Sequence, residues 1–381
     1  MLNDFYKQFK SGTDIRGVAS EGVEGQSINL TDDVVADMAD GFVLWLSKKV
    51  SKKPSELKIS VGRDSRISGP HIMKITTERF KRCGAEVLCC QLASTPSMFM
   101  TTVDLGCDGA LQITASHHPF NRNGLKFFTR EGGLEGSDIE EILLYAQNGE
   151  HPEESNGGNI TDVDYMSDYA KGLCEKIKKE VNAEDYEHPL KGFKIVVDAG
   201  NGAGGFYADK VLSVLGADTT GSRYLEPDGM FPNHVPNPEA KEAMDSICEA
   251  VRESGADLGV IFDTDVDRGG AVDSKGNEIN RNRLVAVAAA IALEGNDGGM
   301  IVTDSITSSV SNNLLKMTSA ESITAIAEAI RMLSTRLLNS TLRASTVLLQ
   351  SKHRDMPQCV KTTFLMTVHI YAQKLLSRRL R

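Results

Sequence analysis

The sequence predicts an α/β protein of more than one domain, with mixed, largely parallel sheets. A chain of 381 residues exceeds the size of a typical single core. Short apolar runs bounded by turn residues alternate with stretches of helical periodicity, which is typical of strands joined by helices. A polar, glycine-bearing stretch at 151–159 separates two such series, so it predicts a domain boundary.

Each series is a succession of strands and helices with a recognisable period. Val35, Met38 and Phe42 recur at helical spacing, and a serine and a threonine before Pro96 are typical of a helix start. Apolar runs of four to seven residues indicate buried strands. The expected strands are 57–62, 86–89, 105–111, 193–198 and 258–262; the expected helices are 31–49, 71–83, one starting at 94–97, and 241–254.

Composition excludes several classes of function. Hydrophobic residues make up 40% and charged residues 25%, which is typical of a globular protein. The net charge of −10 argues against a nucleic-acid partner. The longest apolar run, 284–293, is too short to span a bilayer, and the first residues lack the apolar core of a signal peptide. The seven cysteines form no C-x-x-C pair, so we expect reduced thiols in a cytoplasmic protein without a membrane partner.

The stretch 112–119 is the first candidate site. Ser116 follows the apolar run 105–111 and is followed by His117, His118 and a proline. A serine beside histidines in the loop after a strand is a candidate nucleophile, and loops at the carboxyl ends of parallel strands collect functional groups. A polar loop that only turns the chain is the alternative.

The second candidate site is an acidic cluster that directly follows the strand 258–262. Asp263, Asp265 and Asp267 alternate, so on an extended segment their carboxylates would project to one side. Three converging carboxylates repel one another, and a hard divalent cation relieves that repulsion. Arg268 can offset charge and bind an anion. The sequence argues against an EF-hand, because Arg268 and Ser274 stand where that loop needs glycine and glutamate. A solvated acidic turn is the alternative to a metal site.

A glycine-rich run at 199–205 follows the strand 193–198 and loosely matches a dinucleotide-binding fingerprint. Glycine turns between strands and helices are common, so we expect no dinucleotide there. Near the start of the chain, the turn-rich segment 11–17 contains Arg16.

Together these motifs resemble one family. The Thr-Ala-Ser-His-His-Pro loop with Ser116, the Asn-Gly-Leu-Lys motif ending at Lys126, and the cluster 263–268 resemble the α-D-phosphohexomutases, in particular the bacterial phosphomannomutase/phosphoglucomutase group. The resemblance extends from Ser11 to about Leu315. It implies four domains, of which the first three share an α/β fold.

The resemblance also implies a mechanism. Ser116 would carry a phosphoryl group, and Asp263, Asp265 and Asp267 would hold Mg²⁺ against it. Phosphoserine would convert a mannose or glucose phosphate to the hexose 1,6-bisphosphate and recover a phosphoryl group from its other end, so that the 1- and 6-phosphates interconvert. The remaining assignments are Lys126 and His117 as proton-handling groups, Arg16 beside the serine loop, Arg268 beside the metal loop (or as a salt-bridge partner only), and His118, where many relatives carry asparagine, with its role open.

The resemblance ends near Lys316. No glycine follows Gly299, although the chain contains 34, and the last residues are basic. Codons allowed for Ser351 to Cys359, read from the third base, give Glu-Thr-Ser-Gly-His-Ala-Ala, which resembles the family's sugar-recognition loop. We therefore interpret 317–381 as an out-of-frame tail. The expected division is domain I at 1–150, domain II at 155–275, an incomplete domain III at 276–316 and no domain IV.

Two other functions stay open. Phe262 to Val266 resembles the nucleophile loop of haloacid-dehalogenase-type phosphatases, in which Asp263 would attack and Asp265 would act as acid and base. The chain could also be a non-catalytic product that binds metal or sugar phosphate. Hexose phosphates are the small-molecule partners that the mutase interpretation predicts, and the sequence does not indicate an oligomeric state.

Overall fold

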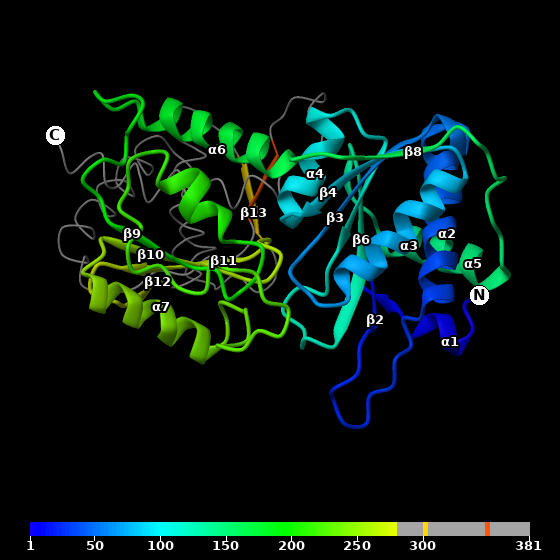
Figure 1. Cartoon of the computed structure of the whole chain (residues 1–381), viewed down its shortest axis with the longest axis horizontal. Coiled ribbons are helices and arrows are strands. Elements are labelled where there is room, and N and C mark those ends of the chain that lie inside the picture. The colour runs from blue at the N-terminus through cyan, green and yellow to red at the C-terminus, as the bar shows by residue number, and fades with distance from the viewer. Residues whose placement is uncertain (280–299, 304–346, 351–381) are drawn as a thin grey trace.

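The computed structural model describes residues 1–279, 300–303 and 347–350. Figure 1 shows two lobes, the N-terminal one in blue to cyan and the second in green to yellow. The first lobe contains, in chain order, α1 (Asp4–Lys7), β1 (Lys10–Ser11), β2 (Asp14–Val18), α2 (Asp32–Val50), η1 (Pro54–Glu56), β3 (Lys58–Arg63), α3 (Gly69–Arg82), β4 (Glu86–Leu92), α4 (Thr95–Asp104), β5 (Gly109–Ile113), β6 (Arg122–Thr129), β7 (Gly132–Gly133), α5 (Gly136–Asn148) and β8 (Asn159–Asp162).

The first sheet has parallel and antiparallel parts. Its order is β1-β2-β6-β5-β3-β4-β8, with β7 paired to β6. Strands β5, β3, β4 and β8 are parallel, whereas β6 and β2 run antiparallel to their neighbours. The α/β class with mixed sheets is thus confirmed. Because β3 and β5 are parallel neighbours, the loops that follow them emerge at the same edge of the sheet.

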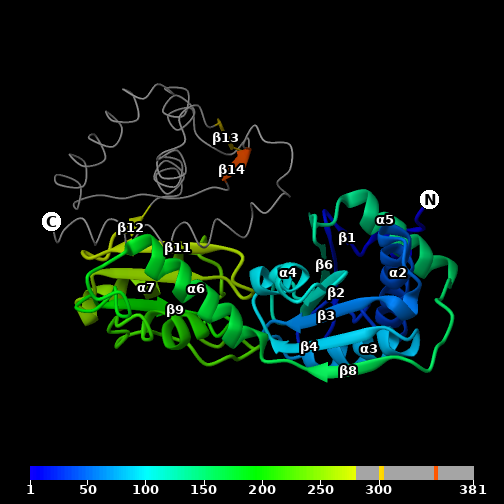
Figure 2. The same ribbon diagram turned by 90° about the horizontal axis from the view of Figure 1, so that it is seen from above.

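The second lobe is built around a smaller mixed sheet of order β12-β11-β10-β9. It contains α6 (Tyr165–Val181), β9 (Ile195–Asp198), η2 (Tyr207–Leu212), α7 (Lys241–Ser254), β10 (Leu258–Phe262), β11 (Gly269–Asp273) and β12 (Glu278–Ile279). Strands β13 (Met300–Thr303) and β14 (Val347–Gln350) form a separate antiparallel pair, visible in Figure 2.

One hydrophobic core crosses from lobe to lobe. Alternate residues of β9 face opposite sides, so Val197 packs in the core shared between the lobes while Val196 packs with α7. The shared core contains Phe99 of α4, Tyr169 of α6 and Phe262 of β10. Burial of these apolar side chains in one core therefore holds the two sheets in a fixed position relative to each other.

Most predicted elements match observed ones. The expected helices 31–49 and 241–254 correspond to α2 and α7, and the expected strand 258–262 to β10. The strand expected at 105–111 is wrong at its start, because Leu105 closes α4 by donating its N–H to Thr101 O at 3.1 Å, and β5 begins at Gly109.

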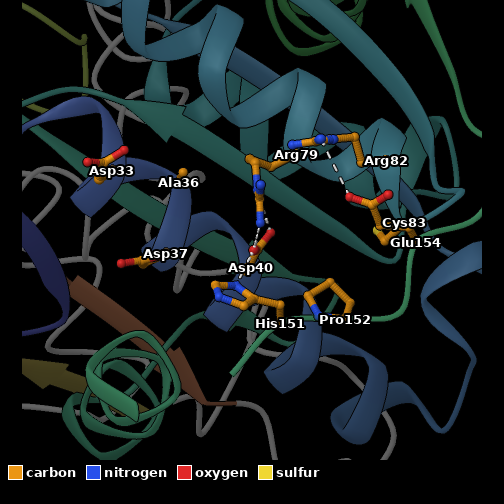
Figure 3. A pocket seen from close by; sticks show the side chains of 10 residues that line it. All are labelled: Asp33, Ala36, Asp37, Asp40, Arg79, Arg82, Cys83, His151, Pro152 and Glu154. Atoms are coloured by element: carbon orange, nitrogen blue, oxygen red, sulfur yellow. Dashed lines mark hydrogen bonds and ion pairs between the residues drawn. The ribbon is translucent and has the colours of Figure 1, made fainter. Parts of the chain in front are cut away.

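The segment that leaves α5 is held to the first lobe by a buried carboxylate. Asp40 on α2 is 1% exposed; it accepts a hydrogen bond from Arg79 Nε at 3.0 Å and lies 2.8 Å from His151 Nδ1 (Figure 3). These side chains line a cavity of about 400 Å³ that contains none of the predicted site residues. After this segment, β8 (Asn159–Asp162) adds a further strand to the first sheet. It begins at the last residue of the predicted boundary at 151–159, so the first sheet extends past that boundary.

Several predictions concern the end of the chain. The incomplete third domain at 276–316 and the out-of-frame tail at 317–381 lie almost entirely outside the described residues. In the described part, no helix is both long enough and apolar enough to cross a bilayer. There, six cysteines are buried and unpaired with one another; Cys359 lies outside it.

Asp40→Ala should destabilise the first lobe. Its removal leaves the partly buried Arg79 without its carboxylate, and we expect the free energy of unfolding to fall by about 2 kcal/mol in chemical denaturation. The matched control is Asp168→Ala, whose ion pair with Lys171 is exposed and should contribute less than about 0.5 kcal/mol. Equal effects of the two substitutions would contradict the anchoring role of Asp40.

Candidate active site

Ser116 lies in a tight loop between β5 and the antiparallel β6. Its backbone is left-handed, with a φ of 50°, and the residue is only 2% exposed. The Ser116 N–H donates to Thr114 Oγ1 at 2.9 Å, which helps to hold a conformation that L-residues seldom adopt. The loop therefore presents one buried hydroxyl in a defined direction.

The aspartate cluster forms the turn of the β10–β11 hairpin. The turn contains Val266 with a φ of 64°, so the expectation of an extended segment that projects alternate side chains to one side is wrong. The turn nevertheless gathers the carboxylates: one oxygen from each of Asp263, Asp265 and Asp267 lies within 4.8 Å of the others. The three carboxylates converge because the loop that carries them turns back on itself.

The serine and aspartate loops meet between the lobes. Ser116 Oγ donates to Asp263 Oδ2 at 3.1 Å, although 147 residues separate them. Arg268 Nη2 contacts both Ser116 Oγ and His117 Nδ1. Its Nε lies 3.2 Å from Asp263 Oδ2, so Arg268 binds both loops and is more than a salt-bridge partner within the second lobe.

Two further groups of the first lobe hold the aspartates. Lys126 Nζ on β6 donates to Asp267 Oδ2 at 2.7 Å. Thr95, the first residue of α4, donates its N–H to Asp265 O at 2.8 Å and its hydroxyl to the Asp265 carboxylate. The amino end of α4 thus adds partial positive charge beside the cluster.

Arg16 on β2 is not in direct hydrogen-bonding contact with Ser116. It pairs with Asp14 at 2.9 Å, and its charge is one cause of the lowered pKa of both loop histidines. The structure therefore places Arg16 within electrostatic range of the serine loop.

Burial and mutual repulsion perturb the carboxylates unequally. Burial, followed by Asp267 and Asp265, raises the pKa of Asp263 well above its usual range. Burial and the charge of Asp267 raise the pKa of Asp265 to about 6. Burial acts in the same direction on Asp267, but the Lys126 ammonium overcomes it and lowers the pKa of Asp267. In turn, although burial opposes its charged form, Asp267 raises the pKa of Lys126.

The two loop histidines are neutral imidazoles at neutral pH. Burial, then Arg268 and Arg16, lowers the pKa of His117 to about 4. Burial and Arg16 lower the pKa of His118 to about 4 as well. His117 Nδ1 lies 3.4 Å from Ser116 Oγ, whereas the His118 ring lies beside that of His117, with ring centres 5.0 Å apart and planes tilted by 31°.

The residues fit a hard divalent cation. The converging donors are carboxylate oxygens plus a hydroxyl, the ligand types that Mg²⁺ takes. Asp265 Oδ1 and Asp267 Oδ1 are buried and have no hydrogen-bond partner within the described part of the chain. Arg268 Nε lies 3.7 Å from Asp267 Oδ1, an ion-pair distance without a hydrogen bond. Buried carboxylate oxygens without a hydrogen bond are costly, so a cation at this position would satisfy them.

The glycine-rich run at 199–205 packs against the aspartate loop. A Cβ at Gly202 would lie 2.6 Å from Thr264 O, and Ala203 N donates to the same oxygen at 2.8 Å. A Cβ at Gly205 would lie 2.2 Å from Leu225 O. These glycines allow close packing of protein backbone, which accounts for them without a dinucleotide.

Sequence reasoning missed Thr95, which it treated only as part of a helix start, and it did not single out Arg66. Arg66 is fully buried and contacts the serine loop. A signal for Arg66 did exist. The Asp64-Ser65-Arg66 segment follows a buried strand that is parallel to the strand before Ser116.

Comparison with known proteins decides the family. The profile described as "Phosphoglucomutase/phosphomannomutase, alpha/beta/alpha domain I" matches residues 7–152, and that of domain II matches residues 168–276. The matches together cover more than half of the chain, in family order. The chain belongs to the α-D-phosphohexomutase family.

Individual relatives agree. This phosphohexomutase-family chain is 29% identical over 307 residues to a phosphoglucomutase of Neisseria meningitidis, covering 80% of this chain and 60% of that protein. It is 30% identical over 294 residues to a phosphomannomutase/phosphoglucomutase of Pseudomonas syringae, covering 76% and 57%. The chain thus matches about 60% of the length of such relatives.

Solved structures share the fold. A phosphoglucomutase/phosphomannomutase family protein from Burkholderia thailandensis superimposes with a TM-score of 0.70 at 21% identity, covering 100% of this chain and 80% of that one. A putative phosphomannomutase from Thermus thermophilus gives 0.65 at 15% identity, covering 96% and 82%.

Arg268→Gln should raise the pKa of His117. A nearby guanidinium disfavours protonation of the imidazole, so its removal should shift the titration from about 4 toward the ordinary 6.5. NMR titration of the His117 ring with divalent ions chelated measures the shift, with Arg252→Gln on α7 as the control. An unshifted midpoint near 6.5 in the unsubstituted protein would contradict the described environment.

Proposed function

We propose that this chain carries the phosphoryl-transfer site of a Mg²⁺-dependent phosphohexomutase, which interconverts hexose 1- and 6-phosphates through phosphoserine at Ser116 and a hexose 1,6-bisphosphate. We also propose that the tail at 317–381 impairs its turnover. The observation that carries the proposal is the contact between Ser116 Oγ and Asp263 Oδ2 at 3.1 Å, reinforced by Arg268. Three carboxylates and two cations surround the buried serine hydroxyl, and this set of charged groups suits a residue that carries a phosphoryl group.

The proposed transfer is a balanced exchange. The bond between Ser116 Oγ and phosphorus breaks as a sugar hydroxyl oxygen bonds to phosphorus. The hydroxyl proton passes to His117, which is neutral and lies 3.4 Å from Ser116 Oγ. Lys126, an ammonium hydrogen-bonded to Asp267, is the candidate donor of a proton to the released serine oxygen. The second half reverses these transfers with the phosphoryl group at the other end of the sugar.

Positive charge supports the transfer. Negative charge spreads over the phosphoryl oxygens, and Arg268 contacts the serine oxygen while its planar guanidinium can bind two such oxygens. Ser116, Asp263, Asp265 and Asp267 would hold Mg²⁺, which would supply further positive charge at that oxygen. Arg16 would contribute longer-range charge from β2.

The proposed partners are mannose and glucose phosphates, in line with the names of relatives such as the Neisseria phosphoglucomutase and the Pseudomonas phosphomannomutase/phosphoglucomutase. We propose no nucleic-acid or membrane partner. We also propose that domain I comprises 1–150, domain II 155–275 and the start of domain III 276–316, with 317–381 out of frame. In this division β8 (Asn159–Asp162) belongs to domain II by sequence and adds a strand to the sheet of domain I.

Ser116 should accept one phosphoryl group from glucose 1,6-bisphosphate in the presence of MgCl₂. Intact mass and peptide mapping of the full chain measure it, and Ser116→Ala should abolish it. Asp265→Asn should slow it by about a hundredfold, because metal ions contribute several kcal/mol to such transfers. Acid-stable phosphate on Ser116 is expected. An acid-labile acyl phosphate on Asp263 would instead identify the phosphatase alternative.

Complete mutase turnover should be weak. If 317–381 is out of frame, the sugar and its distal phosphate lack their family loops, and positioning supplies much of the rate. A coupled assay of the purified 381-residue chain should give less than about 0.01 s⁻¹, roughly a thousandfold below typical enzymes. Family-like turnover would overturn the frameshift interpretation, whereas metal or sugar-phosphate binding without phosphorylation would identify the non-catalytic alternative.

A further inference from the structure

Arg66, in the loop after β3, is a buried cation attached to the backbone of the serine loop. The residue is 0% exposed, and so is its ion-pair partner Asp64. The guanidinium donates from Nη1 to Pro119 O at 2.6 Å and to Arg122 O at 3.0 Å, and from Nη2 to His118 O at 2.7 Å and to Ser116 O. Its Nε lies 3.2 Å from Asp64 Oδ2. All five guanidinium N–H groups therefore have an acceptor.

These contacts determine the backbone of Ser116. Arg66 holds the Ser116 carbonyl, and Thr114 Oγ1 holds its N–H while donating at 2.7 Å to Asp64. The left-handed conformation of a serine is unfavourable by itself, so it persists only where the surroundings hold it. Arg66 and Asp64 supply that restraint from the neighbouring strand.

The second lobe closes over this arginine. The Phe231 ring lies against the guanidinium, with the Arg66 Cζ atom 5.3 Å from the ring centre. Two residues earlier, Gly229 packs so closely on the first lobe that a Cβ would lie 2.5 Å from both Ser65 O and Ile67 N. A loop of the second lobe thus touches the backbone that carries Arg66.

That loop is anchored within its own lobe. His234 Nε2 lies 3.0 Å from Asp198 Oδ1, and Nδ1 lies 2.9 Å from Val235 O. His234 and Asp198 are both buried. Although burial opposes the charged form, the hydrogen bond to Asp198 raises the pKa of His234. The tip that bears Phe231 is therefore tied to the end of β9.

We propose that Arg66 is a positioning residue for Ser116, and that Phe231 and Gly229 make its hold depend on contact between the two lobes. The catalytic part of this inference rests on the proposed function, because it assumes that Ser116 carries the phosphoryl group. The structural part does not. Contact of the second lobe with the Arg66 loop then stiffens the serine loop. The serine loop is therefore fully ordered only when the second lobe, which carries the three aspartates, lies against the first lobe.

Hydrogen exchange in the full-length chain tests the structural part. Gly229→Ala adds a methyl group that the Ser65–Ile67 backbone cannot accommodate, and Phe231→Leu removes the ring over Arg66. Both should speed exchange of peptides covering 114–122. For Phe231→Leu we expect a factor between about 2-fold and 30-fold, the range of a cation–π contact. The melting temperature of each variant should equal that of Met230→Leu, the matched control, which alters an exposed neighbour in the same loop.

Phosphorylation of Ser116 by glucose 1,6-bisphosphate tests the catalytic part. In the Phe231→Leu variant the rate at saturating bisphosphate should fall by a similar factor, while the half-saturating concentration is unchanged, because Phe231 positions the loop without binding the sugar. Arg66→Lys should have a larger effect, since an ammonium has three donors where five are used. If Arg66→Lys does not fold, the two second-lobe variants still decide.

Unchanged exchange at 114–122 in both second-lobe variants, or equal acceleration in Met230→Leu, would overturn the proposal. If exchange accelerates in the second-lobe variants but wild-type Ser116 accepts no phosphoryl group, the proposed function fails and the structural part of the inference stands. If Ser116 is phosphorylated at equal rates in all variants, the positioning role fails and the proposed function stands.

Discussion

Three carboxylates whose oxygens lie within 4.8 Å of one another are the constraint on which the rest of this structure depends. Their mutual repulsion must be offset in a buried place, where water screens little. The hairpin that carries them brings one cation, Arg268, and the other lobe brings Lys126, Thr95 and the amino end of α4. The cluster is therefore stabilised by contacts across the two lobes.

Strand direction decides which groups can reach this place. Parallel β3 and β5 bring the Arg66 and Ser116 loops to the same edge of the first sheet, and antiparallel β6 brings Lys126 beside them. In the second lobe, glycines allow the loop after β9 to lie directly on the aspartate turn. Close backbone packing positions the aspartate turn, whereas the Arg66 side chain holds the serine loop.

The proposed chemistry and the proposed defect occupy different parts of the chain. The phosphoserine loop and the aspartate loop both lie within 1–279, whereas the frameshift interpretation concerns residues after 316. Phosphoryl acceptance and sugar recognition can therefore be separated by experiment. A chain can retain a charged, metal-ready serine site and still convert sugars poorly, because productive turnover also requires the substrate to be held in place.

The sequence alone determined much of this protein. Helical periodicity located α2 and α7, because burial of one face imposes a regular spacing, and a continuous apolar run located the fully buried β10. Local motifs identified Ser116 and the three aspartates. It did not show that the aspartates sit in a turn, that Lys126 neutralises Asp267, or that Arg66 holds the serine backbone. Only the tertiary structure decided these points, because spacing along a chain does not state which strands lie side by side. Packing of the hydrophobic cores selects which strands are neighbours, and the neighbouring strands determine which charged groups come into contact.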